Sequence, residues 1–315
     1  MAQHDTKLPA QNPKVAFLIL AHDDMAMLRR LCARLAPHAV YVHLDRRADV
    51  EADELEKFGP NVHFAKDRSE AHWADFSLVD AAMTLVKLAL GSGNHTHFVL
   101  LSGHCYPIKP VSDFIGLLDK HPDRNFLQLV PISKGSFLYG RLGRHWRTRP
   151  FVPAAANSNR KVLVRLDQLL VRSYNRLSRA LPRDFMREIS PWVPFYGSQW
   201  WALTRSAAEK VVGSAASQFA LRSFRSTFAP DETYMQTVLG NLLEQYAIIG
   251  PNQDRGPASV LDAPLHLVAD SDGRWLADTP ANRLAIQRSD KFFVRKVTSA
   301  QTELLDWIDA EQPKA

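Results

Sequence analysis

The chain has 315 residues, enough for one large α/β domain or two small ones, and its 46% hydrophobic content can form a sizeable core. Its 39 basic and 33 acidic residues give a net charge of +6, which leaves nucleic acid, an anionic membrane or a phosphorylated ligand open as partner. No run of about eighteen apolar residues occurs, which argues against a membrane-spanning helix. Cys32 and Cys105 match neither a metal-binding spacing nor a disulfide framework, so we expect a reducing compartment.

Residues 1–13 are polar and lack the apolar stretch of a signal peptide, so we expect a disordered leader. Residues 14–22 form a continuous apolar run, which predicts a strand buried on both faces, as in a parallel sheet. Helical spacing at 25–35 and a second apolar run at 40–45 complete a strand–helix–strand unit. Further strands are predicted at 62–64, 97–102 and 126–130. Residues 72–80 lead into a predicted helix that runs to about residue 90, and residues 113–118 start another. The predicted fold class is therefore α/β, with a mixed sheet flanked by helices.

Two polar residues stand at predicted strand ends. Ligands of open α/β sheets bind beyond the carboxyl ends of the strands, so His22 and Asp45 fall where a nucleotide would sit. An acid at the end of the second strand is a common partner of ribose hydroxyls. No glycine-rich phosphate loop follows the first strand, however, which argues against a dinucleotide-binding fold.

Two adjacent carboxylates, Asp231 and Glu232, stand at a predicted helix start, where Pro230 fits the first helical position. The positive end of the helix dipole would keep a carboxylate ionised and able to accept a proton. The same pair also fits a simple helix cap. Upstream, residues 196–204 place Gly-Ser before two tryptophans, which indicates a close-approach strand edge and either a flat wall for a sugar ring or ordinary core.

A basic segment runs from Lys134 to Glu188, with thirteen Lys or Arg against three acids. It could face a membrane or an acidic polymer, or it could be a solvated helical face. Aromatic residues are not interleaved with the charges as base-stacking platforms require, so no nucleic acid partner is expected.

Seven motifs occur in an order and spacing similar to those of the core-2/I-branching family of β-1,6-N-acetylglucosaminyltransferases (glycosyltransferase family 14), which also has xylosyltransferase-like and bacterial members. They are Phe17-Leu-Ile-Leu-Ala-His22, Val42-His-Leu-Asp-Arg46, Trp73-Ala-Asp-Phe-Ser77, Leu100-Leu-Ser-Gly-His-Cys-Tyr-Pro-Ile108, Gly197-Ser-Gln-Trp-Trp201, Pro230-Asp-Glu232 and Phe293-Val-Arg-Lys296. The resemblance implies a GT-A fold, which is Rossmann-like, and an enzyme that transfers a sugar from a UDP-sugar with inversion and without an obligatory metal or other cofactor.

The resemblance also implies roles for individual residues. Glu232 matches the general base that takes the proton from the acceptor hydroxyl. His22, Asp45 and Arg46 match the nucleoside-binding strand ends, and Lys296, with Arg274 or Arg295 as second cation, matches the groups that hold the diphosphate. The sugar- and acceptor-binding candidates are Trp73, His104, Arg141, Arg144, Trp146, Ser198, Trp200, Trp201 and Asp231.

Metal dependence is the main alternative. Metal-dependent GT-A enzymes carry Asp-x-Asp after the central strand, where this chain has Ser102-Gly-His-Cys-Tyr106. The one Asp-x-Asp, Asp270-Ser-Asp272, precedes Gly273 and is typical of a turn, although a metal-dependent transferase could use it. Relatives usually carry Asp where this chain has Cys105, so the donor sugar is the open question. GlcNAc is expected first, and xylose, glucose or glucuronate next.

The expected organisation is a single GT-A-type catalytic domain over 14–298 and a C-terminal helix or tail over 299–315. We expect a bacterial cytoplasmic enzyme that acts on a glycan or lipid-linked glycan. Its basic segment would then dock at the inner face of an anionic membrane. A non-catalytic polysaccharide-binding protein remains the alternative from another class, because it would keep the tryptophans without needing Glu232.

Overall fold

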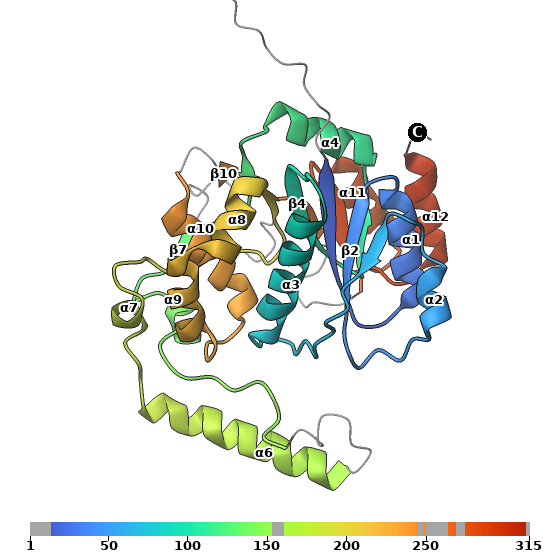
Figure 1. Ribbon diagram of the computed structural model, residues 1–315. Helices are drawn as coiled ribbons and strands as arrows, with labels where there is room; N and C mark the ends of the chain where they lie inside the picture. Colours follow the sequence, from blue (N-terminus) through green and yellow to red (C-terminus); the bar gives the residue numbers. More distant parts are fainter. Residues whose placement is uncertain (1–13, 153–160, 245–247, 250–263, 269–274, 313–315) are drawn as a thin grey trace, which may run out of the picture.

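The computed structural model describes residues 14–152, 161–244, 248–249, 264–268 and 275–312, and a seven-stranded sheet lies at its centre (Figure 1). The strands are β1 (Val15–Ala21), β2 (Ala39–Leu44), β3 (Val62–Phe64), β4 (His97–Ser102), β6 (Asn125–Phe126), β9 (Ala202–Thr204) and β10 (Ile248–Ile249). Their order is β10-β6-β9-β4-β1-β2-β3. Strands β4, β1, β2 and β3 are parallel, whereas β9 is antiparallel to β4 and β6, so the predicted α/β class with a mixed sheet is confirmed.

Strand β1 is buried on both faces, as its continuous apolar run predicts. Ala16, Leu18 and Leu20 pack in a core cluster with α3 (Ser77–Ser92), on one side of the sheet. Phe17 and Ile19 point to the other side, where α1 (Met25–Leu35) and α4 (Val111–Lys120) cover them. Each such buried side chain contributes about 1.5–3 kcal/mol, which makes this three-layer arrangement the main source of stability.

The predicted strand at 126–130 is divided in the structure. Strand β6 ends at Phe126 in the large sheet, and β7 (Val130–Pro131) pairs with β8 (Phe195–Tyr196) in a separate two-stranded sheet. Between them, the Gln128 side chain accepts a hydrogen bond of 2.8 Å from the Ser198 N–H. The apolar pattern of residues 126–130 is the same in either sheet, and so it could not reveal the division.

A second, three-stranded sheet brings the end of the chain onto the end of β4. It consists of β11 (His266–Val268), β12 (Phe293–Arg295) and β5 (Cys105–Pro107). Its register places Arg295 opposite Cys105. Helix α12 (Thr302–Glu311) packs beside this sheet through Leu304, Leu305 and Ile308.

The remaining helices surround this framework, and one of them stands apart. They are α2 (Ala52–Glu56), η1 (Phe137–Arg141), α6 (Lys161–Leu177), η2 (Ser178–Ala180), α7 (Phe185–Glu188), α8 (Arg205–Gly213), α9 (Ala215–Phe224), η3 (Pro230–Glu232), α10 (Tyr234–Leu242) and α11 (Pro280–Arg288). In Figure 1, α6 lies away from the sheet and its covering helices, at the lower edge of the view. Within the described residues, no helix has the length and apolar character needed to cross a membrane.

The helix predicted at the carboxylate pair begins later than expected. Pro230, Asp231 and Glu232 form the 3₁₀ turn η3, and the α-helix α10 follows from Tyr234. The pair therefore lies in a tight turn before the helix, and only its backbone leads into α10.

Candidate active site

Asp45 holds the loop after β2. Its carboxylate is 1% exposed and accepts hydrogen bonds from the Arg47 backbone and guanidinium, at 2.9 Å each, and from the Ala71 N–H at 2.8 Å. Burial acts to raise the pKa of Asp45, but these hydrogen bonds outweigh it and lower the pKa to about 2. Asp45 therefore stays ionised and fixes the loop, with its oxygens already committed to protein donors.

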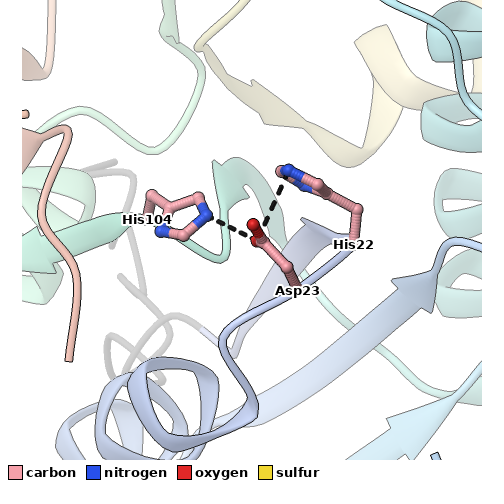
Figure 2. A group of neighbouring side chains, drawn as sticks. All are labelled: His22, Asp23 and His104. Carbon is pink, nitrogen blue, oxygen red and sulfur yellow. Dashed lines mark hydrogen bonds and ion pairs between the residues drawn. The ribbon is translucent and has the colours of Figure 1, made fainter. Parts of the chain in front are cut away.

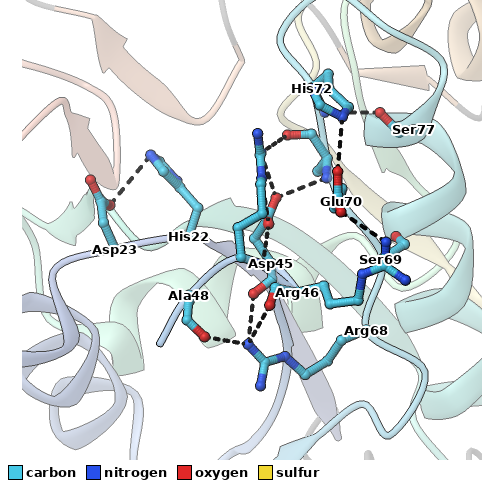
Figure 3. A network of polar contacts seen from close by, with 12 residues as sticks. His22, Asp23, Asp45, Arg46, Ala48, Arg68, Ser69, Glu70, His72 and Ser77 are labelled. Carbon is cyan, nitrogen blue, oxygen red and sulfur yellow. Dashed lines mark hydrogen bonds and ion pairs between the residues drawn. The ribbon is translucent and has the colours of Figure 1, made fainter. Parts of the chain in front are cut away.

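Arg46, in contrast, extends from this loop into solvent. It pairs with Glu70 at 2.8 Å (Figure 3), in a contact that a charged ligand can replace because the arginine side chain is 66% exposed. Arg68 holds the same loop in place, because its guanidinium donates hydrogen bonds to the backbone carbonyls of Asp45 and Ala48 at 2.8 and 2.7 Å. The loop thus presents the Arg46 guanidinium to solvent on a fixed backbone.

His22 and His104, which follow β1 and β4, both turn toward the carboxylate of Asp23 (Figure 2). The distances to Asp23 Oδ1 are 3.4 Å from His22 Nε2 and 2.7 Å from His104 Nε2. The other ring nitrogen of His104 lies 3.0 Å from the Val297 carbonyl oxygen, which fixes the ring orientation. The three ligand atoms lie within 4.8 Å of one another, and within the described part of the chain this is the one such group that could hold a metal ion.

Asp24 fastens the segment after Lys296 to the end of β1. Its carboxylate accepts hydrogen bonds from the Thr298 hydroxyl at 2.6 Å and from the Ser299 N–H at 2.8 Å. Burial acts to raise the pKa of Asp24, yet these donors lower it to about 2. The Val297 N–H also donates to the His104 carbonyl at 3.1 Å, so Lys296 is held beside the strand ends.

Arg295 is the half-buried cation of the site. Its guanidinium lies over the Trp200 ring, 4.4 Å from the ring centroid, and faces Cys105. Burial lowers the pKa of Arg295, and its interactions with Cys105, Asp231 and Glu232 act in the opposite direction. Arginine remains charged under such shifts, so a fixed positive charge stands between β5 and the carboxylate pair.

Cys105 is fully buried and has polar neighbours. Its sulfur lies 3.3 Å from the Ser102 hydroxyl and 3.5 Å from His266 Nε2. Burial raises the pKa of the Cys105 thiol, so this position, where the resemblance leads us to expect Asp, is neutral here.

Glu232 forms an ion pair with Arg141 from the end of η1. Its neighbour Asp231 has an Oδ1 atom that is shielded from solvent and has no hydrogen-bond partner among the described residues. Burial, together with the charge of Glu232, raises the pKa of Asp231 to about 7. Two adjacent carboxyl groups thus have different environments: Glu232 has a cationic partner, and Asp231 has a low-dielectric site in which the neutral form is favoured.

Backbone hydrogen bonds join three distant segments around this pair. Phe228 N–H donates to Arg141 O at 3.0 Å, Ala229 N–H to Ala74 O at 3.1 Å, and Trp146 N–H to Ser226 O at 2.7 Å. Ala74 and Ala229 both have left-handed backbone conformations, with φ of 56° and 48°. Such residues cost about 1–3 kcal/mol each, and the surrounding hydrogen bonds must offset this cost.

The same junction carries an aromatic surface beside Glu232. The Phe228 ring contacts Trp73 at 5.6 Å and Trp146 at 4.8 Å, and the Arg144 guanidinium lies 3.6 Å from the Trp146 ring. Trp73 is 78% exposed, so it offers a ring face to a ligand. The candidate acceptor residues Trp73, Arg141, Arg144 and Trp146 are therefore brought together.

The Gly-Ser-Gln-Trp-Trp motif, residues 197–201, packs against the backbone of the candidate site. The predicted close approach is confirmed, because a Cβ on Gly197 would lie 1.9 Å from the Gln128 carbonyl oxygen. The Gly197 N–H also donates to the Glu232 carbonyl at 2.9 Å. Ser198 and Trp201 are buried, and Trp201 is 1% exposed within the core, so the expectation of a sugar-facing ring there is corrected. Trp200 is buried beneath Arg295.

Some predictions lie elsewhere, and some residues were missed. Arg274, Asp270 and Asp272 lie outside the described residues. Sequence reasoning missed Asp23, although it follows His22 directly, and it missed Phe228. It also missed Trp275, an exposed ring that meets the edge of His104 at 4.7 Å.

Comparison with known proteins places this geometry in a family. The family model of the Core-2/I-Branching enzyme matches residues 15–248. Xylosyltransferase oxt of Drosophila melanogaster is 29% identical over 76% of this chain and 26% of its own length. Xylosyltransferase 2 of Rattus norvegicus is 27% identical over 74% of this chain and 25% of its own length. Xylosyltransferase 2 of Homo sapiens is 26% identical over 76% of this chain and 26% of its own length.

The chain thus spans about a quarter of the length of the curated relatives it matches. Among solved structures, HddC from Yersinia pseudotuberculosis aligns with 41% of this chain and 63% of its own at 17% identity, with a TM-score of 0.25. The family model covers well over half of the chain. This chain belongs to the Core-2/I-branching enzyme family.

Proposed function

We propose that the chain is an inverting glycosyltransferase that moves a sugar from a UDP-sugar to a hydroxyl of a glycan acceptor. Glu232 is the general base, Arg295 and Lys296 hold the diphosphate, and no metal is required. Trp73, Phe228 and Trp146 bind the acceptor. The nucleoside lies at the strand ends, next to His22 and Arg46.

One observation carries the proposal: η3 sets its two carboxylates near two cations from distant parts of the chain, Arg141 and Arg295. Arg141 forms an ion pair with Glu232, and the half-buried Arg295 interacts with both Asp231 and Glu232. A base and a diphosphate-binding cation must be neighbours in an inverting transferase, because the acceptor attacks C1 on the face opposite the leaving phosphate.

The path of the acceptor proton follows from this arrangement. The acceptor hydroxyl gives its proton to Glu232 as its oxygen attacks C1, and the bond from C1 to the UDP oxygen breaks. Asp231, with its pKa raised to about 7 by burial and by the charge of Glu232, already carries a proton in part of the population at neutral pH, and in those molecules Glu232 is the carboxylate left to accept the acceptor proton. The leaving diphosphate gains about one unit of negative charge, which fixed Arg and Lys groups stabilise.

The donor class is a UDP-sugar, and two sugars come first. UDP-GlcNAc follows from the motif resemblance. UDP-xylose is a candidate donor because the similar proteins are named xylosyltransferases. UDP-glucose and UDP-glucuronate are the next donors to assay.

Turnover of Glu232→Gln tests the proposal. We expect kcat to fall by roughly 10²–10⁴-fold, with the Kd for UDP nearly unchanged, because general-base catalysis contributes about this much. Glu209→Gln, at an exposed glutamate of α8, is the matched control and should keep wild-type turnover. Near-normal turnover by Glu232→Gln would refute the assignment. Glycan binding without turnover of any of the four donors would instead support a non-catalytic polysaccharide-binding protein.

A metal-dependent transferase is the second candidate, and the group His22, Asp23 and His104 favours it. The Nδ1 atom of His104 faces a backbone carbonyl, which is the usual arrangement of a histidine that binds a metal through Nε2. Calorimetric titration with UDP in EDTA and then in Mn²⁺ separates the candidates. We expect the same Kd in both. A requirement for Mn²⁺ that is lost in Asp23→Asn would favour the metal-dependent enzyme.

A further inference from the structure

Helix α6 is attached to the protein along one face. The Val152 N–H donates to Asp167 Oδ1 at 2.8 Å, and the side chain of Asn175 exchanges two hydrogen bonds with the Arg147 backbone, at 2.9 and 2.8 Å. Asp167, Val171 and Asn175 recur every four residues, so they define one side of the helix. This side faces the segment that contains Thr148 and Pro150, across a shallow hollow that both line.

The opposite side of α6 is an uncovered apolar stripe. Its members follow helical spacing, which places them on one face. They are Val162, Leu166, Leu169, Leu170 and Leu177, and each is 51–71% exposed. Leu181, just beyond the helix, is 73% exposed. Isolated exposed leucines are ordinary, but a continuous stripe of this size marks an interaction surface.

A row of arginines borders the apolar stripe. Arg165, Arg172 and Arg176 lie on the side of the helix next to Leu169, and all three are exposed. None of them has an ion pair with another described residue of the structure. The one acid between Lys161 and Leu181 is Asp167, which faces the protein, against five basic residues. The outer surface of α6 is therefore apolar and cationic at once.

We propose that α6 docks on an anionic lipid bilayer, with the apolar stripe in the acyl boundary and the arginines at the headgroup phosphates. A helix with one strongly apolar face and a cationic border lies in the plane of the interface. At about 1.5 Å per residue, its 17 residues extend over roughly 25 Å, and its arginines prevent it from spanning the bilayer. Charge complementarity selects an anionic surface, and the adjacent leucines select lipid over a purely polar polyanion.

The docked orientation bears on the proposed function. Arg147, which is bonded to Asn175 of α6, directly follows Trp146 of the aromatic acceptor surface. A bilayer under α6 would bring the headgroup region toward the acceptor side of the candidate site, which suits a lipid-linked glycan. This last step rests on the proposed function, whereas the docking itself does not.

Co-sedimentation of the full chain with vesicles is the test. We expect binding to vesicles of phosphatidylcholine and phosphatidylglycerol in equal amounts at low salt, and weak binding to phosphatidylcholine alone. Leu166→Asp with Leu169→Asp should weaken the partition coefficient roughly tenfold for each leucine, because apolar burial is lost. The matched control is Leu284→Asp with Phe219→Asp, two exposed apolar residues of α11 and α9, and it should bind as wild type.

The arginine row gives a second measurement. Arg165→Gln, Arg172→Gln and Arg176→Gln together should weaken binding to the mixed vesicles roughly a hundredfold, at about fivefold for each cation near an anionic surface. The control removes the same net charge elsewhere, through Lys87→Gln, Arg222→Gln and Arg288→Gln, three exposed positions.

Three results would overturn the inference. The first is absence of wild-type binding to the mixed vesicles, and the second is equal loss in the test and control variants. The third is a wild-type dimer in solution that the leucine substitutions dissociate, with no vesicle binding, because a second copy would then cover the stripe. None of these readouts uses turnover, so failure of the docking inference is distinct from failure of the proposed activity.

Discussion

The candidate site has two sides that are built in different ways. The carboxylate side contains Glu232 with Arg141, and the cation side contains Arg295 and Lys296. On the carboxylate side, the junction of three distant segments holds Glu232 against Arg141, and it contains two residues with left-handed backbone. On the cation side, Arg295 belongs to a regular strand paired with β5, and Asp24 anchors the residues just after Lys296.

This difference matches what each side must do. A general base acts only as the proton moves, so its position must be held to a fraction of an ångström. Diphosphate-binding cations act in both the bound donor and the transition state, so charge matters more than fine position. Hydrogen bonds between loops therefore hold the carboxylate whose orientation is needed, and strand pairing holds the cation whose charge is needed. Left-handed residues occur on both sides, because Asp24 on the cation side has a φ of 46°.

The largest expected effect is on the free energy of unfolding and concerns Asp231 of the carboxylate side. Burial of its ionised carboxyl group destabilises the folded protein. Its pKa is raised from 3.8 to about 7 by burial and by the charge of Glu232. Folding therefore favours the neutral carboxyl, and that stability is fully present below pH 3.8 and is lost as the pH rises through 7. Asp231→Asn should raise the free energy of unfolding, by as much as about 4 kcal/mol above pH 7 and by less at pH 5.

Urea unfolding at pH 5 and pH 8 measures this effect. Asp49→Asn, at an exposed aspartate, is the control and should change stability little at either pH. An equal gain from Asp231→Asn at both pH values would show that the carboxyl is not the buried, neutral group inferred from the structure.

The next effect concerns Arg141. Arg141→Ala removes the partner that orients Glu232, and we expect kcat to fall about 10²-fold, as a small misplacement of a catalytic group does. The Kd for UDP should stay within a few-fold of wild type, because Arg141 belongs to the carboxylate side. Arg141→Lys keeps the charge and should recover part of kcat. A rise in the Kd for UDP with unchanged kcat would place Arg141 at the donor instead.

Lys296→Ala should mainly change the Kd for UDP, in contrast to Arg141→Ala, which should mainly change kcat. We expect the Kd for UDP to rise roughly tenfold or more, since a hydrogen bond between charged groups contributes about 1.5–3 kcal/mol. The cost should shrink with added salt, because Lys296 is partly exposed and its charge is screened. Lys291→Ala, on the same segment, is the control. Equal effects of both substitutions would mean that UDP responds to the general charge and that Lys296 has no special contact.

The two sides also differ in how far the sequence predicted them. The apolar run of β1 determined its burial on both faces, and the polar residues at the strand ends predicted the edge where His22 and His104 meet. Arg295 and Lys296 were found through a motif. Cys105, the partner of Arg295, lies 190 residues earlier in the chain, however, and only the register of β12 on β5 brings the two together.

The carboxylate side was predicted less completely. Glu232 and Arg141 were both named, but their ion pair depends on backbone bonds between loops, which have no periodic pattern. Phe228 was missed for the same reason. Trp201 was assigned to a sugar surface because adjacent tryptophans have the same pattern in a core and in a binding wall, and burial distinguishes the two only in the folded protein.

The smallest expected effect concerns Trp73, on the outer rim of the carboxylate side. Its ring is exposed and rests on Phe228 by an edge-to-face contact, so it can stack on an acceptor sugar without a change in the core. Trp73→Ala should raise the acceptor KM several-fold, as expected for the loss of one aromatic contact of about 1 kcal/mol, with the Kd for UDP unchanged. Phe219→Ala, at an exposed aromatic residue of α9, is the control. Because Trp73 touches only the acceptor in this arrangement, a change in UDP affinity alone would move the ring to the donor and require the acceptor surface to be sought elsewhere.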